Sequence, residues 1–140
     1  MQSIIHQEQP QQYIERVKLR EKGQFWTPDW IAEAMVAYVS HNANLIFDPC
    51  VGMGAFYTAL KKFFPQKNFY GIDNDPEIIL KVKEKTAFDK ASKIELRDFI
   101  LNPPQEFFKA IVANPPYIRH HRLSQNIKTH FHKLSLLNIG

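Results

Sequence analysis

The sequence has very little cysteine, no long apolar run and no leader pattern. Cys50 is the only cysteine in the 140 residues, which excludes an internal disulfide and a metal centre built from several cysteines. No stretch approaches the roughly 20 apolar residues of a membrane span, and the pattern of a secretory signal peptide is missing at the start. We therefore expect a cytoplasmic protein that makes no membrane contact and holds no metal.

Acidic residues are also missing from the last part of the chain. Residues 118–140 contain four Lys and Arg residues, four histidines and no Asp or Glu, so this segment accounts for the whole net charge of +4. A basic segment attracts phosphate groups. Charge alone leaves open whether the segment binds phosphates or is a solvated helix face.

The chain of 140 residues is about one domain long. Along the rest of it, short apolar segments typical of strands alternate with segments whose apolar residues have helical spacing. Strands are predicted at residues 45–47, 68–72, 93–97 and 109–113, and helices at residues 56–64, 76–88 and 124–137. This alternation predicts an α/β fold, a parallel sheet covered on both faces.

The N-terminal region is expected to contain an arm followed by a helix. Residues 1–22 are predicted to be a partly disordered arm with a short helix at residues 13–19, and residues 23–140 to belong to one domain. An apolar stripe at residues 31–39 predicts a further helix, which Thr27 can cap and whose first turn suits Pro28.

Each predicted strand ends in a polar residue, where open α/β sheets build their sites. The loop after the first strand contains Gly52 and Gly54, which let the backbone turn tightly and approach a ligand closely. A dinucleotide fingerprint would need a third small residue at the position of Tyr57. The two glycines could also serve only the turn.

Two aspartates extend this pattern. Asp73 lies 19 residues after Gly54 and can accept both hydroxyls of a ribose, although it could also be a surface cap. Asp98 can accept from an adenine amino group and Phe99 can stack on the ring, although Asp98 alone is weak evidence. Together these residues describe a nucleoside pocket without a pyrophosphate cradle, which favours S-adenosylmethionine over NAD.

The end of the fourth predicted strand has the composition of an amine-binding turn. The Asn114 side-chain oxygen and the Pro115 carbonyl can each accept one hydrogen of an exocyclic amine, and Tyr117 can stack on its ring. Pro115 and Pro116 each fix their own φ and stiffen the turn. A second Asn-Pro-Pro at residues 102–104 is followed by Gln105 and is interpreted as a connecting loop.

The ordered set of motifs resembles the gamma class of adenine-specific DNA methyltransferases of bacterial restriction–modification systems. The resemblance rests on residues 23–28, 48–56, 71–76, 98–99 and 114–117. It implies a Rossmann-like methyltransferase fold, S-adenosylmethionine as cofactor and double-stranded DNA as partner. It also implies a catalytic turn at Asn114, Pro115, Pro116 and Tyr117, with Tyr117 stacked on a flipped adenine. The residues expected to bind the donor are Phe25, Thr27, Asp48, Cys50, Gly52, Gly54, Asp73, Asn74, Asp98 and Phe99.

The chain departs from the family in having about four predicted strands where the family has seven. We therefore expect the N-terminal part of a larger catalytic domain, with the target-recognition domain on a missing C-terminal portion or a partner subunit. The alternatives are a protein-glutamine or RNA-guanine methyltransferase, which share the Asn-Pro-Pro-Tyr turn, and an inactive assembly subunit. A metal-dependent nuclease is less supported, because no paired acid–Lys motif is evident.

Overall fold

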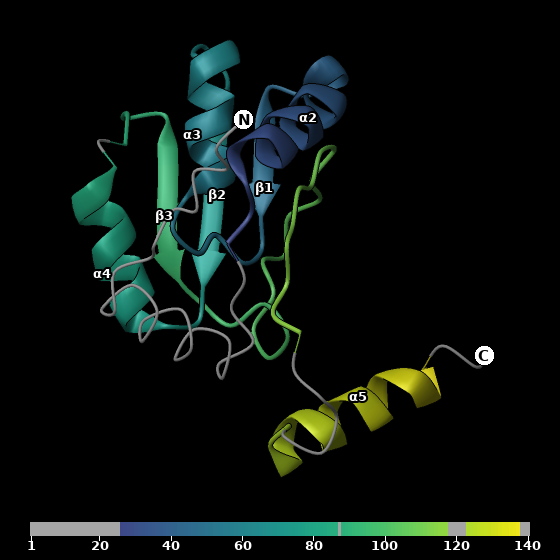
Figure 1. The fold of residues 1–140 in the computed structure, drawn as a ribbon. Coiled ribbons are helices and arrows are strands. Elements are labelled where there is room, and N and C mark those ends of the chain that lie inside the picture. Colours follow the sequence, from purple (N-terminus) through teal and green to yellow (C-terminus); the bar gives the residue numbers. More distant parts are fainter. Residues whose placement is uncertain (1–25, 87, 118–122, 138–140) are drawn as a thin grey trace, which may run out of the picture.

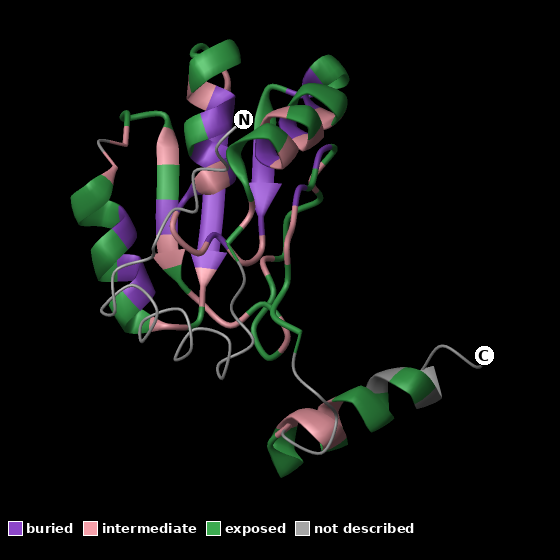
Figure 2. Cartoon of the chain, in the orientation of Figure 1, coloured by how far each residue is buried: buried purple, intermediate pink, exposed green. Residues whose placement is uncertain are grey.

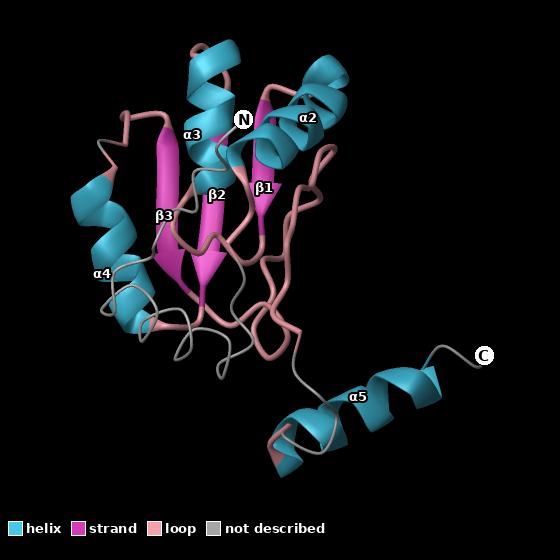
Figure 3. Ribbon diagram, in the orientation of Figure 1, coloured by secondary structure: helices cyan, strands magenta, loops and turns pink. Residues whose placement is uncertain are grey.

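The computed structural model describes residues 26–86, 88–117 and 123–137, and its strands form one parallel sheet (Figure 1, Figure 3). The sheet contains β1 (Leu45–Asp48), β2 (Asn68–Asp73) and β3 (Ser92–Leu96), in the order β1-β2-β3. The helical elements are α2 (Asp29–Val39), η1 (Ser40–Asn42), α3 (Ala55–Phe63), α4 (Pro76–Lys85) and α5 (Gln125–Leu137). The predicted arm at residues 1–22 lies outside the described residues.

The predicted fourth strand at residues 109–113 is reduced to a single β-bridge between Phe47 and Ile111. The Phe47 N–H donates to the Ala110 carbonyl at 3.0 Å, and the Val112 N–H donates to the Phe47 carbonyl at 2.9 Å. The prediction of a full strand is wrong, because the two prolines that soon follow have no N–H to extend the ladder. The bridge nevertheless holds the segment beside β1, on the side away from β2.

Helices α2, α3 and α4 pack on one face of the sheet, so in the described part of the chain the expected cover of both faces is provided by helices on one face only. Val36 of α2, Leu60 of α3 and Val82 of α4 share one buried cluster with Ile46 and Phe69 of the sheet (Figure 2). The strand order runs in one direction, and right-handed crossovers that progress in one direction place their helices on the same face.

Aromatic side chains cover the opposite face. Phe47 and Tyr70 are buried there with Ile72. The ring of Phe108, from the loop after β3, stacks on Phe47 with 4.1 Å between the ring centroids. This loop therefore closes the second face and leads the chain back to the β1 edge.

Helix starts follow the sequence in one case and not in another. Asp75 caps α4 as predicted, since its Oδ1 accepts from the Glu77 N–H at 3.0 Å. Thr27 does not cap α2, because Pro28 occupies the N-cap and no side chain bonds the first turn. None of the helices in the described part of the chain is long and apolar enough to cross a membrane.

Candidate active site

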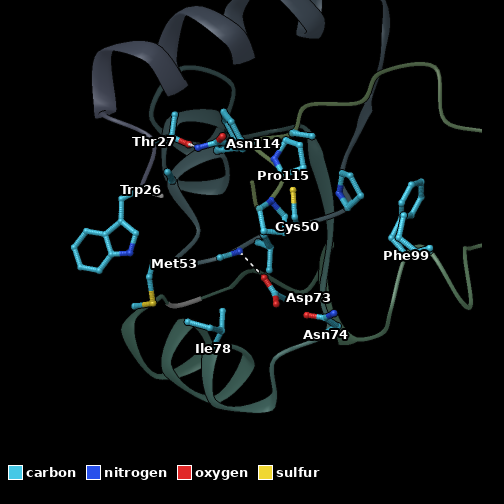
Figure 4. Close-up of a pocket in the computed structure, with 18 residues that line it drawn as sticks. Trp26, Thr27, Cys50, Met53, Asp73, Asn74, Ile78, Phe99, Asn114 and Pro115 are labelled. Carbon is cyan, nitrogen blue, oxygen red and sulfur yellow. Dashed lines mark hydrogen bonds between the residues drawn. The ribbon is translucent and has the colours of Figure 1, made fainter. Parts of the chain in front are cut away.

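A cavity of about 490 Å³ lies where the loop after β1, the end of β2 and the Asn114 turn meet (Figure 4). The predicted site residues that line it are Thr27, Cys50, Gly52, Asp73, Asn74, Phe99, Asn114, Pro115 and Pro116. Those that are described but do not line it are Asp48, Gly54, Asp98 and Tyr117. Phe25 lies outside the described residues.

Asp73 is anchored at the end of β2 by two backbone groups. Its Oδ2 accepts from the Gly52 N–H at 3.0 Å, and its Oδ1 accepts from the Asp75 N–H at 3.0 Å. Burial raises the pKa of this carboxyl, although these N–H groups oppose the shift. The Asn74 backbone also interacts with the Asp73 carboxyl. A carboxylate has about four acceptor positions, so it keeps acceptor capacity for a ligand in the cavity.

The loop after β1 needs two left-handed residues to reach the cavity. Gly52 has a φ of +50°, and Gly54, the N-cap of α3, has a φ of +80°. The Val51 N–H donates to the Ile72 carbonyl at 2.8 Å and ties the loop to β2. The backbone of this loop therefore forms one wall of the cavity close to Asp73.

Asn114 is held by the segment that precedes α2. Its Nδ2 donates to Thr27 Oγ1 at 3.0 Å, a contact between residues 87 positions apart in the chain (Figure 4). Asn114 and Thr27 are both partly exposed to the cavity that they line. The amine-binding turn and the N-terminal motif are thus parts of one site.

Asp48 at the end of β1 is fully buried, and Cys50 in the loop that follows is partly buried. The pKa of the Asp48 carboxyl is raised to about 7, chiefly by burial and to a smaller extent by the neighbouring Asp73. The Cys50 N–H, which donates to Oδ1 at 3.1 Å, opposes this rise. Burial and the nearby Asp48 charge raise the pKa of the Cys50 thiol to about 12. Cys50 is therefore a neutral thiol at neutral pH.

Asp98 organises the turn after β3. Its Oδ1 accepts from the N–H groups of Ile100 at 2.8 Å and Leu101 at 2.9 Å, and its Oδ2 accepts from Asn74 Nδ2 at 3.4 Å. Phe99 does line the cavity, with 40% of its surface exposed. Phe99 thus faces the cavity, whereas the Asp98 carboxylate is bonded to the backbone of the turn.

The sequence profile of the family described as N-6 DNA Methylase matches residues 11–138. The chain belongs to this family. The resemblance inferred from the motifs is thereby confirmed at the level of the N-6 DNA methylases, and the assignment to the gamma class stays a prediction.

Curated relatives of the chain are much longer than the chain itself. The Type II methyltransferase M.XamI of Xanthomonas campestris pv. amaranthicola is 27% identical over 114 residues, which cover 76% of this chain and 21% of the relative. The Type II methyltransferase M.AccI of Acinetobacter calcoaceticus is 27% identical over 123 residues, covering 84% and 23%. A release factor glutamine methyltransferase of Thermodesulfovibrio yellowstonii is 32% identical over 89 residues, covering 62% and 32%. The chain therefore spans about a fifth of the length of the two Type II relatives.

A solved structure supports the fold. The plantazolicin methyltransferase BpumL in complex with SAH superposes with a TM-score of 0.50 at 12% sequence identity, covering 91% of this chain and 49% of that one. The predicted methyltransferase-like α/β fold, present in part, is confirmed by this likeness together with the parallel sheet.

Several apolar residues that line the cavity were not among the predicted site residues, and Trp26, Met53 and Ile78 are examples. Trp26, Met53 and Ile78 lie on the opposite side of Asp73 from Phe99 (Figure 4). Trp26 lies in the motif at residues 23–28 and Met53 in the motif at residues 48–56, so both could have been predicted as site residues. Ile78 gives no such signal, because its place in the first turn of α4 is fixed only by the Asp75 cap.

Proposed function

We propose that this N-6 DNA methylase binds S-adenosylmethionine and transfers its methyl group to the exocyclic amine of adenine in DNA. One observation carries the proposal: the Asn114-Pro115-Pro116 turn lines the same cavity as Asp73 and the glycine loop. The acceptors proposed for the target amine and the carboxylate proposed for the ribose of the donor therefore face the same cavity. The names of the Type II relatives support DNA as the substrate.

The residues that line the cavity fit a nucleoside-containing donor. A volume of about 490 Å³ lies within the range of about 300–1,000 Å³ typical of small-molecule sites. Asp73 keeps acceptor positions for ribose hydroxyls, and the glycine loop allows close approach of the backbone. S-adenosylmethionine supplies an electrophilic methyl group on a positively charged sulfur.

The Asn114 turn prepares the amine. The Asn114 Oδ1 and the Pro115 carbonyl each accept one amine hydrogen, which favours a tetrahedral nitrogen with its lone pair free. That lone pair would form the new N–C bond as the bond between the methyl group and the donor sulfur breaks. The electron pair of the broken bond would stay on the sulfur, and one amine hydrogen would leave as a proton to solvent. Tyr117 is 68% exposed, and we expect it to stack on an adenine flipped out of the duplex, a contact that contributes about 1–3 kcal/mol.

Sequence selection needs more surface than these residues provide. Specific base contacts contribute about 1–3 kcal/mol each on an interface of roughly 1,000 Å² or more. We infer that residues 23–140 are the N-terminal part of a catalytic domain in a restriction–modification enzyme. A further portion of the protein or a partner subunit carries the target-recognition domain.

Donor binding tests the first half of the proposal. Replacing Asp73 by Asn keeps an acceptor for the loop but removes the charge, so the affinity for S-adenosylmethionine should fall about 10- to 100-fold in calorimetry. Glu84→Gln, an equal charge change at an exposed position of α4, should leave the affinity unchanged. A folded wild-type chain that binds no donor would contradict the proposal.

Label transfer tests the second half. Tritiated methyl from the donor is offered in parallel to DNA, RNA and a release factor, with adenine N6 analysed in the DNA. The glutamine alternative is worth testing because of the 32% identity to a release factor glutamine methyltransferase. Labelled release factor beside unlabelled DNA would reverse the assignment.

A further inference from the structure

Trp26 lines the cavity and keeps 66% of its surface exposed. We propose that its indole ring binds the positively charged sulfur of S-adenosylmethionine through a cation–π contact. The cavity would then prefer the methyl donor to the demethylated product, S-adenosylhomocysteine, whose sulfur is uncharged. The inference rests on the proposed function, because it names the residue by which the same cavity distinguishes donor from product.

Trp26 lies at the end of the cavity where the methyl group has to be transferred. It directly precedes Thr27, whose Oγ1 accepts from Asn114 Nδ2 at 3.0 Å. Asn114 belongs to the turn proposed to bind the target amine, and direct transfer requires the sulfur that carries the methyl group to lie next to that amine. Phe99, the residue expected to stack on the adenine of the donor, lies on the other side of Asp73 from Trp26 (Figure 4).

The cavity offers a positive charge few ionised partners. Asp73 is the only acidic or basic side chain among the described residues that line the cavity. Its carboxyl already accepts from the N–H groups of Gly52 and Asp75, and its remaining capacity is proposed for the ribose hydroxyls. A positive charge beside Asn114 therefore has to be stabilised by neutral groups, and the electron-rich face of an indole is the most effective aromatic ring for that purpose.

The ring of Trp26 is also not covered by a cation of the protein itself, as far as the structure describes the chain. The cation–π contacts of the described residues join lysines to other rings, namely Tyr57, Phe63, Phe64 and Tyr70. Met53 and Ile78 lie on the same side of Asp73 as Trp26 and are apolar (Figure 4). They would exclude water from a cation bound at the ring, and desolvation strengthens such a contact.

Calorimetry with two ligands isolates the contribution of the sulfur charge. S-adenosylmethionine and S-adenosylhomocysteine share the adenosine and the amino-acid group, so a contact with either of these parts affects both ligands equally. Trp26→Leu keeps an apolar side chain and removes the ring, so the Kd of the donor should rise about 3- to 10-fold more than the Kd of the product. Trp26→Phe keeps a weaker ring and should give an intermediate ratio. Retained affinity for the product shows that each variant is folded.

Trp30→Leu is the matched control, because Trp30 is 72% exposed on α2 and does not line the cavity. This substitution should leave both affinities unchanged. Equal weakening of the two ligands by Trp26→Leu would show that the ring contacts a part they share, and unchanged affinities would show that it contacts neither. Either result would overturn the inference and leave the proposed function standing, whereas a folded wild-type chain that binds neither ligand would overturn the proposed function itself.

Discussion

At the scale of single residues, Asp48 combines full burial with an incomplete set of partners. None of its side-chain surface is exposed, and its Oδ2 accepts no hydrogen bond from the described part of the chain. Burial, followed by the nearby Asp73 charge, raises the pKa of the carboxyl to about 7, against the effect of the Cys50 N–H. The folded state therefore prefers this carboxyl in its protonated form.

The stability of the protein should depend on pH through Asp48. Between an unfolded-state pKa of about 4 and the folded-state value of about 7, the folded state binds a proton that the unfolded state has lost. The free energy of unfolding should therefore fall as pH rises through this range, by up to about 1.4 kcal/mol per pH unit. Urea unfolding at pH 5, 6 and 7.5, or nearby values, measures the slope.

Asp48→Asn is the matched comparison, because Asn keeps the oxygen that accepts from Cys50 but does not titrate. The wild type should lose stability relative to this variant as pH rises from about 4 to about 7. Parallel curves for the two proteins would show that the Asp48 carboxyl has an ordinary pKa in the folded state.

At the scale of elements, Gly54 joins the donor loop, α3 and α4. It is the N-cap of α3 with a φ of +80°, and a Cβ there would lie 3.0 Å from Val82 Cγ2 of α4. Gly52 also has a positive φ, +50°, but a Cβ there would meet nothing closer than 3.9 Å. The two positions thus share backbone strain and differ in packing.

Gly54→Ala should destabilise the protein more than Gly52→Ala. Each substitution costs about 1–2 kcal/mol for a left-handed alanine, and Gly54→Ala adds about 1 kcal/mol or more because Val82 must move. Urea unfolding of both variants at one pH gives the difference directly. Equal losses would mean that α4 can shift away from the loop at no cost.

The elements also show how far the sequence determines the structure. The start of α4 was predictable, because Asp75 and Pro76 form a local cap whose geometry needs no distant partner. The extent of the segment at residues 109–113 was not, because a strand is defined by its neighbour and here only Phe47 provides one. Local chemistry can be read from the chain, whereas pairing across the sheet depends on the fold.

Thr27 illustrates the same limit at the site. Its sequence context, followed by proline and an apolar helix, indicates a cap, and a hydroxyl in that position often is one. In the structure this hydroxyl instead accepts a hydrogen bond from Asn114, which lies 87 residues away in the chain. By contrast, Asp73, Gly52 and Asn114 were predictable as parts of one site, because strand ends of a parallel sheet meet at the same edge.

At the scale of the whole molecule, α5 stands apart from the sheet and the other helices (Figure 1). It follows the Asn114 turn in the chain and contains Lys128 and Lys133, with no acidic residue. A basic helix beyond the proposed amine site is suited to DNA phosphates. The far end of α4 contains an equal charge in Lys83 and Lys85.

The salt dependence of DNA binding distinguishes these two basic surfaces. Each lysine that contacts a phosphate adds about 0.9 to the slope of log K against log salt. Replacing Lys128 and Lys133 by Gln should therefore lower the slope by about 1.8, measured by fluorescence anisotropy with a DNA duplex. Lys83→Gln with Lys85→Gln removes the same charge from α4 and should change the slope little, since neither lysine is among the residues that line the cavity. Equal changes in the slope for both pairs would mean that DNA binding depends only on the net charge of the protein. α5 would then not contact the phosphates beside the Asn114 turn.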